Sequence, residues 1–294
     1  MRIFVTGSTG FVGSAVVKEL ISAGHTVLGL ARSDAAAQWL MSAGADVHRG
    51  SLEDLDSLRR GAAASEGVIH LGFIHDFTKF KENCEIDKLA IEALGSALEG
   101  SGRPLMVTSG TGGLGVPGQL ATEDDVPPPN SPLPRVSEQT AFAMLPNGVS
   151  ASVIRLPQVH DTVKQGLVTY LIAVAREKGV SAYVGEGLIR WSAAHVLDVA
   201  RLYRLALEKH EAGARYHAVA EEGVRMRDIA EVIGRALQVP VKPLAPEEAT
   251  AHFGWLAMFA SHDLLASSTQ TQEKLGWHPT GPGLIADLEQ MHYL

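Results

Sequence analysis

Residues 6–13, Thr6-Gly7-Ser8-Thr9-Gly10-Phe11-Val12-Gly13, decide the fold that we predict for this chain. An apolar run, residues 3–5, precedes them, and apolar residues at helical spacing follow as far as Ile21. This order predicts a strand, a glycine turn and a helix, which is the setting that a dinucleotide-binding loop requires. Gly7 would allow the turn, Gly10 would let the backbone approach a pyrophosphate, and Gly13 would let helix and strand pack closely. A glycine-rich turn without a ligand is the alternative.

The composition is that of an ordinary folded protein. The 294 residues are 46% hydrophobic and 20% charged, enough for one large or two modest domains. The net charge of −8 argues against non-specific binding to nucleic acid or to an anionic membrane, since both need a basic surface. We expect no membrane span and no targeting peptide before the strand that starts at Arg2. The single cysteine, Cys84, suits a reducing compartment, and we expect a cytoplasmic location.

The first half of the chain alternates apolar runs with amphipathic stretches, which is typical of a parallel sheet covered by helices. The predicted strands are 3–6, 26–30, 46–49, 68–71, 105–108 and 151–156, and the predicted helices are 12–23, 34–43, 55–64, 79–99 and 138–145. Such a repeat predicts a Rossmann-type, doubly wound α/β sheet, whose ligands bind at the carboxyl ends of the strands.

The second half is less regular, with predicted helices at 167–178, 196–209, 226–237 and 284–291 and strands at 181–184 and 216–219. We assign 1–160 to a dinucleotide-binding domain that segments around 188–220 complete. Residues 161–294 would form a smaller, mostly helical C-terminal substrate cap.

Residues 117–134 interrupt the alternation with six prolines and the acidic run Glu123-Asp124-Asp125. Because this composition opposes regular structure, we predict a loop with its acids on a solvated surface. A lid or substrate-binding loop is the alternative, since long loops in compact domains often have such roles.

With this glycine loop, this alternation and a cap-like second half, the chain resembles the extended branch of the short-chain dehydrogenase/reductase superfamily. Residues 6–13 match that branch's T-G-x-x-G-x-x-G. The stretches 68–73, 103–111, 135–138, 153–160 and 276–279 resemble an atypical group, the NAD-dependent epimerase/dehydratase-like proteins. The resemblance implies a nicotinamide cofactor, a small-molecule substrate and, as a family expectation, a homodimer.

One departure from the family's pattern affects the chemistry. Typical members exchange a proton with the substrate through a Tyr-x-x-x-Lys pair, and Pro134 and Glu138 align with its two positions. The first tyrosine of this chain is Tyr170, and no tyrosine has a lysine four places later. The standard proton relay is therefore missing. Arg135 and Glu138, on the helix that would carry it, would pair with each other, bind the cofactor ribose or contact substrate.

The residues after the second predicted strand favour NADP(H) over NAD(H). An NAD-selective protein has Asp or Glu there to hold the ribose 2′-OH, whereas this chain has Arg32 and Ser33. Arginine pairs with a 2′-phosphate, and Ser33 would add a hydroxyl contact or cap the next helix. The other predicted cofactor contacts are Ser8, Thr9, Phe11 and Val12 in the glycine loop, and Thr108. The family resemblance further implies that Ser51 and Leu52 lie near adenine, Leu71, Gly72 and Phe73 along the ribose and pyrophosphate, and Pro157 and Val159 beside the nicotinamide.

Candidates for proton transfer follow the predicted strands. Ser109 aligns with the family's substrate-binding serine or threonine, and Thr111 is an alternative; each hydroxyl would otherwise make a local turn bond. Histidine is the natural substitute for the missing tyrosine because its pKa lies near neutrality. We single out His75 and His160, with a structural role as the alternative for each. The spacing of the histidines and the single cysteine predicts no metal site.

Three functions compete. We favour an NADP(H)-dependent oxidoreductase, a reductase or dehydrogenase of a small, largely apolar carbonyl or alcohol substrate, with a non-standard proton donor. The alternatives are an epimerase or dehydratase that recycles bound NAD(P), and an NAD(P)-binding redox sensor or regulatory protein without catalysis. The large apolar residues of the cap would line a substrate pocket or pack the core of the cap; they are Trp191, Phe253, Trp255, Met258 and Phe259. The substrate and its stereochemistry stay open.

Overall fold

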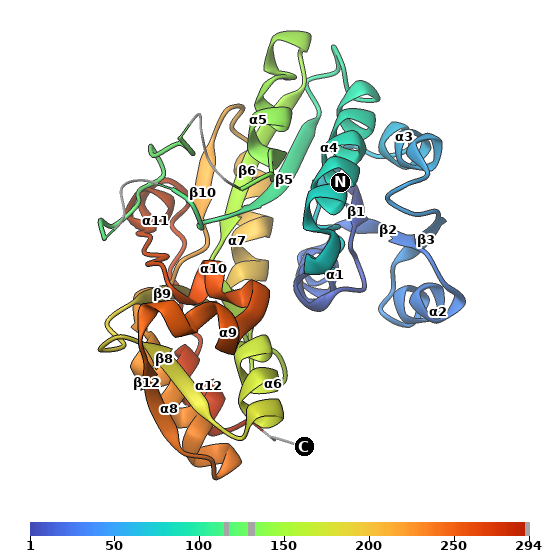
Figure 1. The fold of residues 1–294 in the computed structure, drawn as a ribbon. Coiled ribbons are helices and arrows are strands. Elements are labelled where there is room, and N and C mark those ends of the chain that lie inside the picture. Colours follow the sequence, from blue (N-terminus) through green and yellow to red (C-terminus); the bar gives the residue numbers. More distant parts are fainter. Residues whose placement is uncertain (115–117, 129–132, 292–294) are drawn as a thin grey trace.

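Seven parallel strands form the central sheet of the computed structural model, which describes residues 1–114, 118–128 and 133–291 (Figure 1). The strands are β1 Arg2–Thr6, β2 Thr26–Ala31, β3 Asp46–Arg49, β4 Gly67–His70, β5 Pro104–Gly110, β6 Ser150–Leu156 and β10 Arg215–His217. Their order is β3-β2-β1-β4-β5-β6-β10, so the direction of strand addition reverses between β1 and β4. This confirms the predicted Rossmann-type, doubly wound fold, in which ligands bind at the carboxyl ends of the strands beside the reversal.

Helices cover both faces of the sheet. One face carries α1 Phe11–Ser22, α2 Asp34–Ser42 and α7 Val196–Lys209, and the other carries α3 Leu55–Ala63, α4 Phe80–Ser96 and α5 Ser137–Phe142. Side chains of a strand alternate between its two faces. Accordingly Ile3 and Val5 belong to the core under α1 and α7, whereas Phe4 belongs to the core under α3 and α4. All three are fully buried, as in a strand covered on both sides.

The observed bounds lie close to the predicted ones in this half of the chain. Each of the six predicted strands begins and ends within two residues of the observed strand. The predicted helix 79–99 is shorter in the structure, where α4 ends at Ser96 and the 3₁₀ turn η1 Phe77–Lys79 precedes it. A strand that we did not predict, β7 Gln158–His160, follows β6 directly after Pro157.

The C-terminal cap mixes short helices with short strands. Its elements are α6 Val168–Lys178, β8 Ser181–Val184, β9 Arg190–His195, β11 Glu221–Arg225, α8 Met226–Leu237, β12 Val241–Leu244, η3 Pro246–Glu248, α9 Ala249–Phe253, η4 Gly254–Leu256, α10 Ala257–Ala260 and α12 Leu284–Glu289. Strands β7, β9 and β11 form one sheet, and β8 pairs with β12. Within 188–220, β10 is a strand of the large sheet and α7 packs on it; α11 Thr269–Leu275 also packs there, against β10 and α7. The domain boundaries themselves stay a prediction.

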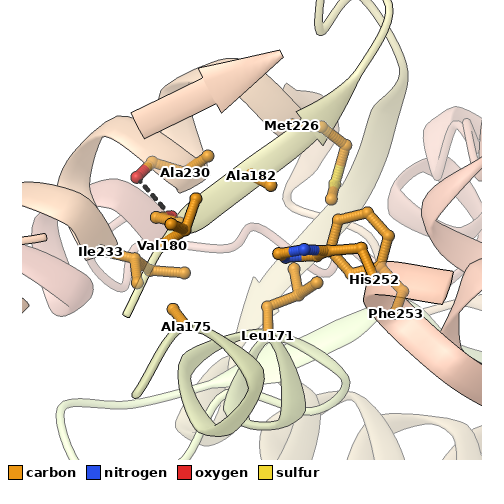
Figure 2. Close-up of a pocket in the computed structure, with 10 residues that line it drawn as sticks. Leu171, Ala175, Val180, Ala182, Met226, Ala230, Ile233, His252 and Phe253 are labelled. Atoms are coloured by element: carbon orange, nitrogen blue, oxygen red, sulfur yellow. Dashed lines mark hydrogen bonds between the residues drawn. The ribbon is translucent and has the colours of Figure 1, made fainter. Parts of the chain in front are cut away.

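A cavity of about 10 Å³ lies within the core of the cap (Figure 2). Leu171, Met226, Ile233 and Phe253 line it, and the His252 ring points into it. This volume holds one water molecule at most, so the cavity is a packing defect and no substrate pocket. No helix among the described residues combines the length and apolar character needed to cross a bilayer.

The expectation that the acidic run is solvated is wrong for Glu123, whereas Asp124 is exposed as predicted. Glu123 is buried, and its carboxylate accepts hydrogen bonds from the backbone N–H (2.8 Å) and the hydroxyl (2.6 Å) of Thr271. The Asp125 carboxylate caps Thr122, while its backbone carbonyl accepts a bond from the buried Arg155. The loop is therefore fastened to α11 and β6. Residues 117 and 129–132 of the predicted loop lie outside the described residues.

Candidate nucleotide-binding and active site

The glycine turn between β1 and α1 is too closely packed to hold side chains. Gly7 has φ +64°, and a Cβ on it would lie 2.7 Å from the backbone N of Gly72, just beyond β4. A Cβ on Gly13 would lie 2.0 Å from the Gly7 carbonyl oxygen. The tight turn and the close approach of helix and strand, which we predicted for these glycines, are thus present.

The amino end of α1 is open to an anion. Its N-cap, Gly10, makes no side-chain hydrogen bond to the first turn, which also contains no acidic residue. In contrast, Ser33 caps α2 and Asp54 caps α3, each by accepting a bond from a backbone N–H. Since free N–H groups at a helix start bind phosphate well, this end fits the diphosphate of a dinucleotide.

The ends of β2 and β3 present two arginines. Arg32 is exposed and has no ion pair among the described residues, whereas Arg49 pairs with Asp34 at 2.5 Å. Asp34, the acid nearest to Arg32 in the sequence, is therefore already paired with another arginine. The Ser33 hydroxyl accepts a bond from the Ala36 N–H, so its role as a helix cap is real, and its own O–H group is left for a ligand.

The remaining predicted cofactor residues lie at strand ends, but several side chains are already engaged. The Ser8 hydroxyl donates to the Leu30 carbonyl, and Val159 is buried in the core. Leu52 packs against Gly72, where a Cβ would come 2.8 Å from its side chain. Half-buried positions are Phe11, Val12, Ser51, Leu71, Phe73 and Pro157, and Thr9 is exposed. Contact of these residues with a cofactor stays a prediction.

Three hydroxyls at the end of β5 differ in what they bind. Thr108 donates to the His70 carbonyl (2.7 Å) and contacts the Tyr203 hydroxyl (2.7 Å). Thr111 is 4% exposed, and its hydroxyl lies 3.4 Å from that of Ser192. Ser109 is half-buried, and its hydroxyl has no hydrogen-bond partner in the described part of the chain. Ser109 is therefore the hydroxyl that is free to bind a ligand.

Tyr203 does not replace the missing catalytic tyrosine. Its side chain is fully buried on α7, and its hydroxyl is held by Thr108. Burial raises the pKa of this phenol further above neutrality. It is therefore a structural residue under the end of β5.

The two histidines that we singled out have different surroundings. His75 is exposed, with its ring edge-on to Phe73 at 5.2 Å; local desolvation and the charge of Arg135 lower the pKa of this imidazole. His160 is fully buried, with Nδ1 2.6 Å from the carboxylate of Asp287 in α12. Burial lowers the pKa of His160, although Asp287 opposes the shift. Thus His75 and Ser109 are accessible, whereas Thr111 and His160 are buried; a catalytic role stays a prediction for all four.

Glu138, at the aligned lysine position, turns away from Arg135. Its carboxylate accepts two bonds of 2.8 Å from Arg155 and one of 2.6 Å from Arg215. Burial alone would raise the pKa of Glu138, but these arginines lower it. Arg135 instead donates from Nη2 to the Thr108 carbonyl (2.9 Å) and from Nε to the Ser137 hydroxyl (2.8 Å). A pair between Arg135 and Glu138, one of our alternatives, is therefore wrong.

Aromatic rings connect the segment after β4 with the cap, and we call them the aromatic wall. The wall consists of Phe73, His75, Phe77 and Phe80 from residues 73–80, and Tyr170, Trp255 and Phe259 from the cap. Phe77 stacks on Trp255 with ring centroids 4.2 Å apart. Of the large cap residues singled out from the sequence, Trp255 and Phe259 join this wall, Trp191 and Phe253 pack the cap core, and Met258 is 43% exposed.

Comparisons with known proteins agree with this fold. A family model described as the NAD dependent epimerase/dehydratase family matches residues 3–220. The chain belongs to this family. The structure is similar to that of UDP-glucose 4-epimerase from Thermotoga maritima, with a TM-score of 0.77, 20% identity and coverage of 99% of this chain and 97% of the other. That likeness is one of fold.

Sequence relatives of this family member have different activities. The uncharacterized protein C2A9.02 of Schizosaccharomyces pombe is 49% identical over the full length of both chains. A UDP-glucose 4-epimerase of Streptomyces lividans is 25% identical, covering 99% of this chain and 96% of its own. A sterol-4-alpha-carboxylate 3-dehydrogenase (decarboxylating) of Dictyostelium discoideum is 27% identical, covering 77% and 73%. The relatives thus support an enzyme that binds NAD(P), without naming its reaction.

Two residues of the site, Asp87 and Ser137, were missed from the sequence. Asp87 lies on the buried face of α4, between Cys84 and Leu94, and is 1% exposed. A carboxylate at the spacing of apolar, inward-facing positions was the available signal, since a buried charge requires partners. Cys84 packs beside it, and burial raises the pKa of the Cys84 thiol to about 11, which argues against a nucleophile.

Proposed function

We propose that this family member is an NADP(H)-dependent reductase or dehydrogenase of a small, largely apolar carbonyl compound or alcohol. The supporting observation is the free Ser109 hydroxyl at the end of β5, beside Arg135 and the aromatic wall that begins at Phe73. A single polar anchor next to aromatic surface suits an apolar molecule with one oxygen function. The likeness to a sterol dehydrogenase, an oxidoreductase by its name, supports the same proposal.

The chain's own residues would divide the work as follows. The uncapped start of α1 would bind the diphosphate, and Arg32 would pair with a 2′-phosphate, which is why we propose NADP(H). When bound, the coenzyme supplies or accepts the hydride. Ser109 would orient the substrate oxygen, since a serine hydroxyl is a poor acid at neutral pH.

Proton exchange would involve His75 or water. The lowered pKa of His75 keeps its ring mostly neutral near pH 7, so it would accept a proton during alcohol oxidation more readily than it would donate one during carbonyl reduction. In the reductive direction water would then supply the proton.

We further propose a cytoplasmic location and a homodimer.

The proposal is tested by binding and turnover of free coenzyme. Purified protein is titrated with NADPH and NADH by fluorescence, and NADPH consumption is followed with aldehydes, ketones and quinones. Tighter binding of NADPH together with reduction of apolar carbonyls would support the proposal. No NADPH consumption with any compound of the panel would overturn it.

The same preparation distinguishes the two alternatives. Tightly bound NAD(P) that co-purifies, with interconversion of UDP-glucose and UDP-galactose but no turnover of free coenzyme, would favour the epimerase, as the relative from Streptomyces lividans suggests. Coenzyme binding without any chemistry would favour a sensor, for which the missing Tyr-x-x-x-Lys pair speaks.

A further inference from the structure

We propose that Arg135 takes over the task of the missing Tyr-x-x-x-Lys pair by binding the substrate oxygen and stabilising the negative charge that develops on it. This inference rests on the proposed reductase function. Arg135 lies in the loop just before α5, and its guanidinium reaches the carbonyl of Thr108, the residue before Ser109.

The guanidinium of Arg135 is fixed in place from three directions. Its Nη2 donates to the Thr108 carbonyl at the end of β5, and its Nε donates to the Ser137 hydroxyl at the start of α5. Its Cζ lies 4.4 Å from the centre of the Phe73 ring, just after β4. Such a fixed donor loses little entropy when it binds a ligand.

Part of the guanidinium is free. An arginine has five N–H donors, and contacts with described residues account for two of those of Arg135. The side chain is 23% exposed. Arg155, another arginine near α5, is fully buried and bonds Glu138, the Glu123 and Asp125 carbonyls and His217. All N–H donors of Arg155 therefore bond within the protein, whereas part of those of Arg135 have no partner among the described residues.

Asp87 supplies the counter-charge without blocking those donors. This buried carboxylate lies 3.9 Å from Arg135 Nε and is bridged to it by Ser137, whose hydroxyl donates to Asp87 at 2.5 Å. Burial alone would raise the pKa of Asp87, but bonds from His70 and Ser137 and the charge of Arg135 lower it. An ionised Asp87 thus holds Arg135 electrostatically while its N–H groups stay available.

The chain of bonds continues to the nucleotide side of the site. Gly72 N–H donates to the Thr6 hydroxyl, which leaves that hydroxyl to donate to His70 Nδ1 (2.8 Å). His70 Nε2 then carries the proton and donates to Asp87 (3.2 Å). With this tautomer of His70, each bond of the buried chain joins one donor to one acceptor. The chain therefore holds Arg135 in register with the end of β4 before any ligand binds, which is the preorganisation that electrostatic catalysis needs.

Location favours the substrate over the coenzyme as the ligand of Arg135. The diphosphate already has the open end of α1. Arg135 instead touches Phe73, where the aromatic wall begins, and the residue before Ser109. The oxygen of an apolar molecule lying on the wall would receive bonds from both Arg135 and Ser109.

The proton and electron balance is simple. A hydride from NADPH forms the new C–H bond at the carbonyl carbon, the C=O π pair moves onto oxygen, and NADPH is oxidised to NADP⁺. Arg135 stabilises this alkoxide and keeps its own protons, because a guanidinium is not deprotonated near neutral pH. Water then protonates the alkoxide.

The test compares Arg135→Gln, Arg135→Lys and Arg135→Ala with Arg59→Gln, whose arginine forms an exposed pair with Asp56 on α3. For the best carbonyl of the panel, Arg135→Gln should lower kcat/KM by about 100- to 1,000-fold, as removal of one oxyanion donor does. Added methylguanidine should restore part of the rate in Arg135→Ala, and Arg59→Gln should match the wild type.

A binding measurement adds a readout that needs no turnover. Benzoate, an apolar ring with an anionic oxygen group, is titrated into the NADP⁺-loaded proteins by calorimetry. Arg135→Gln should bind it about tenfold more weakly, or about 1.4 kcal/mol, with NADP⁺ affinity unchanged and Arg135→Lys in between. Circular dichroism and thermal unfolding report whether each variant is folded.

The outcomes separate the two proposals. Loss of NADP⁺ affinity with benzoate binding intact would overturn the inference by making Arg135 a coenzyme ligand. Wild-type rates in Arg135→Gln, or equal benzoate affinity in all variants, would overturn it as well. A wild type that is silent with every carbonyl overturns the proposed function instead, and weaker benzoate binding by Arg135→Gln would still identify Arg135 as an oxygen-binding residue.

Discussion

Two buried arginine networks flank α5, and they differ in how far the protein satisfies its own charges. Around Glu138, the side chain of Arg155 has no exposed surface and every neighbouring group belongs to the protein. Around Asp87, the side chain of Arg135 is 23% exposed, and three of its five N–H donors have no partner among the residues that the structure describes. The same contrast recurs at helix starts, since α2 is capped by Ser33 and α1 by nothing. We call the network around Glu138 closed, because its charges are paired within the protein, and the network around Asp87 open, because Arg135 keeps donors for a ligand. A closed network stabilises the fold, whereas an open one marks a site where a ligand is expected to bind.

Breaking the closed network should give the largest effect. Glu138→Leu would leave Arg155 and Arg215 without their carboxylate, and a buried charge stripped of its partner costs about 3–5 kcal/mol. Urea unfolding measures this loss. Asp56→Asn, which removes only an exposed partner of Arg59, is the control and should change stability by less than about 1 kcal/mol. A cost for Glu138→Leu as small as that of the control would show that the network does not hold the fold.

A side chain added in the glycine turn between β1 and α1 should weaken coenzyme binding. In Gly13→Ala the new Cβ would meet the Gly7 carbonyl oxygen, so α1 must move away from the turn. Overpacking of this kind costs about 1–3 kcal/mol, and NADPH affinity should fall by more than about tenfold. Lys18→Ala, at an exposed position of the same helix α1, is the matched control. Fluorescence titration of both variants that gave equal NADPH affinity would contradict this prediction.

Removing the open arginine at β2 should change selectivity rather than stability. Arg32 is exposed without an ion pair among the residues described, so Arg32→Gln should leave the melting temperature unchanged. The loss of one charge-assisted contact, about 1.5–3 kcal/mol, should weaken NADPH binding but not NADH binding. Calorimetry with both coenzymes checks this. Equal weakening of the two would show that Arg32 contacts no 2′-phosphate.

Low pH should lower the stability of the fold, because it protonates buried histidines. Burial lowers the pKa of His160 and His217 below the value of about 6.5 that unfolded histidine has. Between those values the unfolded chain binds protons that the folded chain does not, so their stabilisation is present above about pH 6.5 and is lost as pH falls below it. The lowered pKa values of Asp87 and Glu138 place their loss nearer pH 4. Melting temperatures that stayed constant from about pH 7 to pH 5 would contradict this order.

The smallest effect is expected in the cap core. His252 Nε2 is buried without a hydrogen-bond partner among the described residues, beside the small cavity of Figure 2. His252→Leu removes this unpaired nitrogen and should stabilise the protein by up to about 1 kcal/mol. Thermal unfolding measures the gain. His252→Gln is the polar control, and equal stability of the two variants would mean that the nitrogen is solvated.

The sequence predicted the fold well because local signals decide it. The alternation of Ile3, Phe4 and Val5 specifies a strand buried on both faces, and the glycines after it specify one turn and one helix start. The site was predicted less completely because partners far apart in the chain decide it. The Glu123 carboxylate looked solvated until its bond to Thr271, 148 residues away, placed it in the interior.

The same limit applies to the hydroxyls and histidines near the end of β5. In the sequence, Ser109 and Thr111 are equally good candidates for a substrate-binding hydroxyl. In the structure only Thr111 is buried, against Ser192 from the distant strand β9. His75 and His160 differ in the same way, because a cap helix supplies Asp287 to His160. Residue type identifies these side chains as candidates, but long-range packing decides which of them are accessible to a ligand.

The parallel rings of Phe77 and Trp255 give this protein an optical reporter of its own. Phe77 lies in the segment after β4 and Trp255 in the cap, so a molecule that inserts between these two parts separates the rings and changes the surroundings of the indole. Of the other three tryptophans, Trp191 and Trp277 are wholly buried elsewhere and would contribute a constant background, and Trp39 is half-buried on α2. Stopped-flow emission from the native chain can therefore time the arrival and departure of substrate without any attached dye.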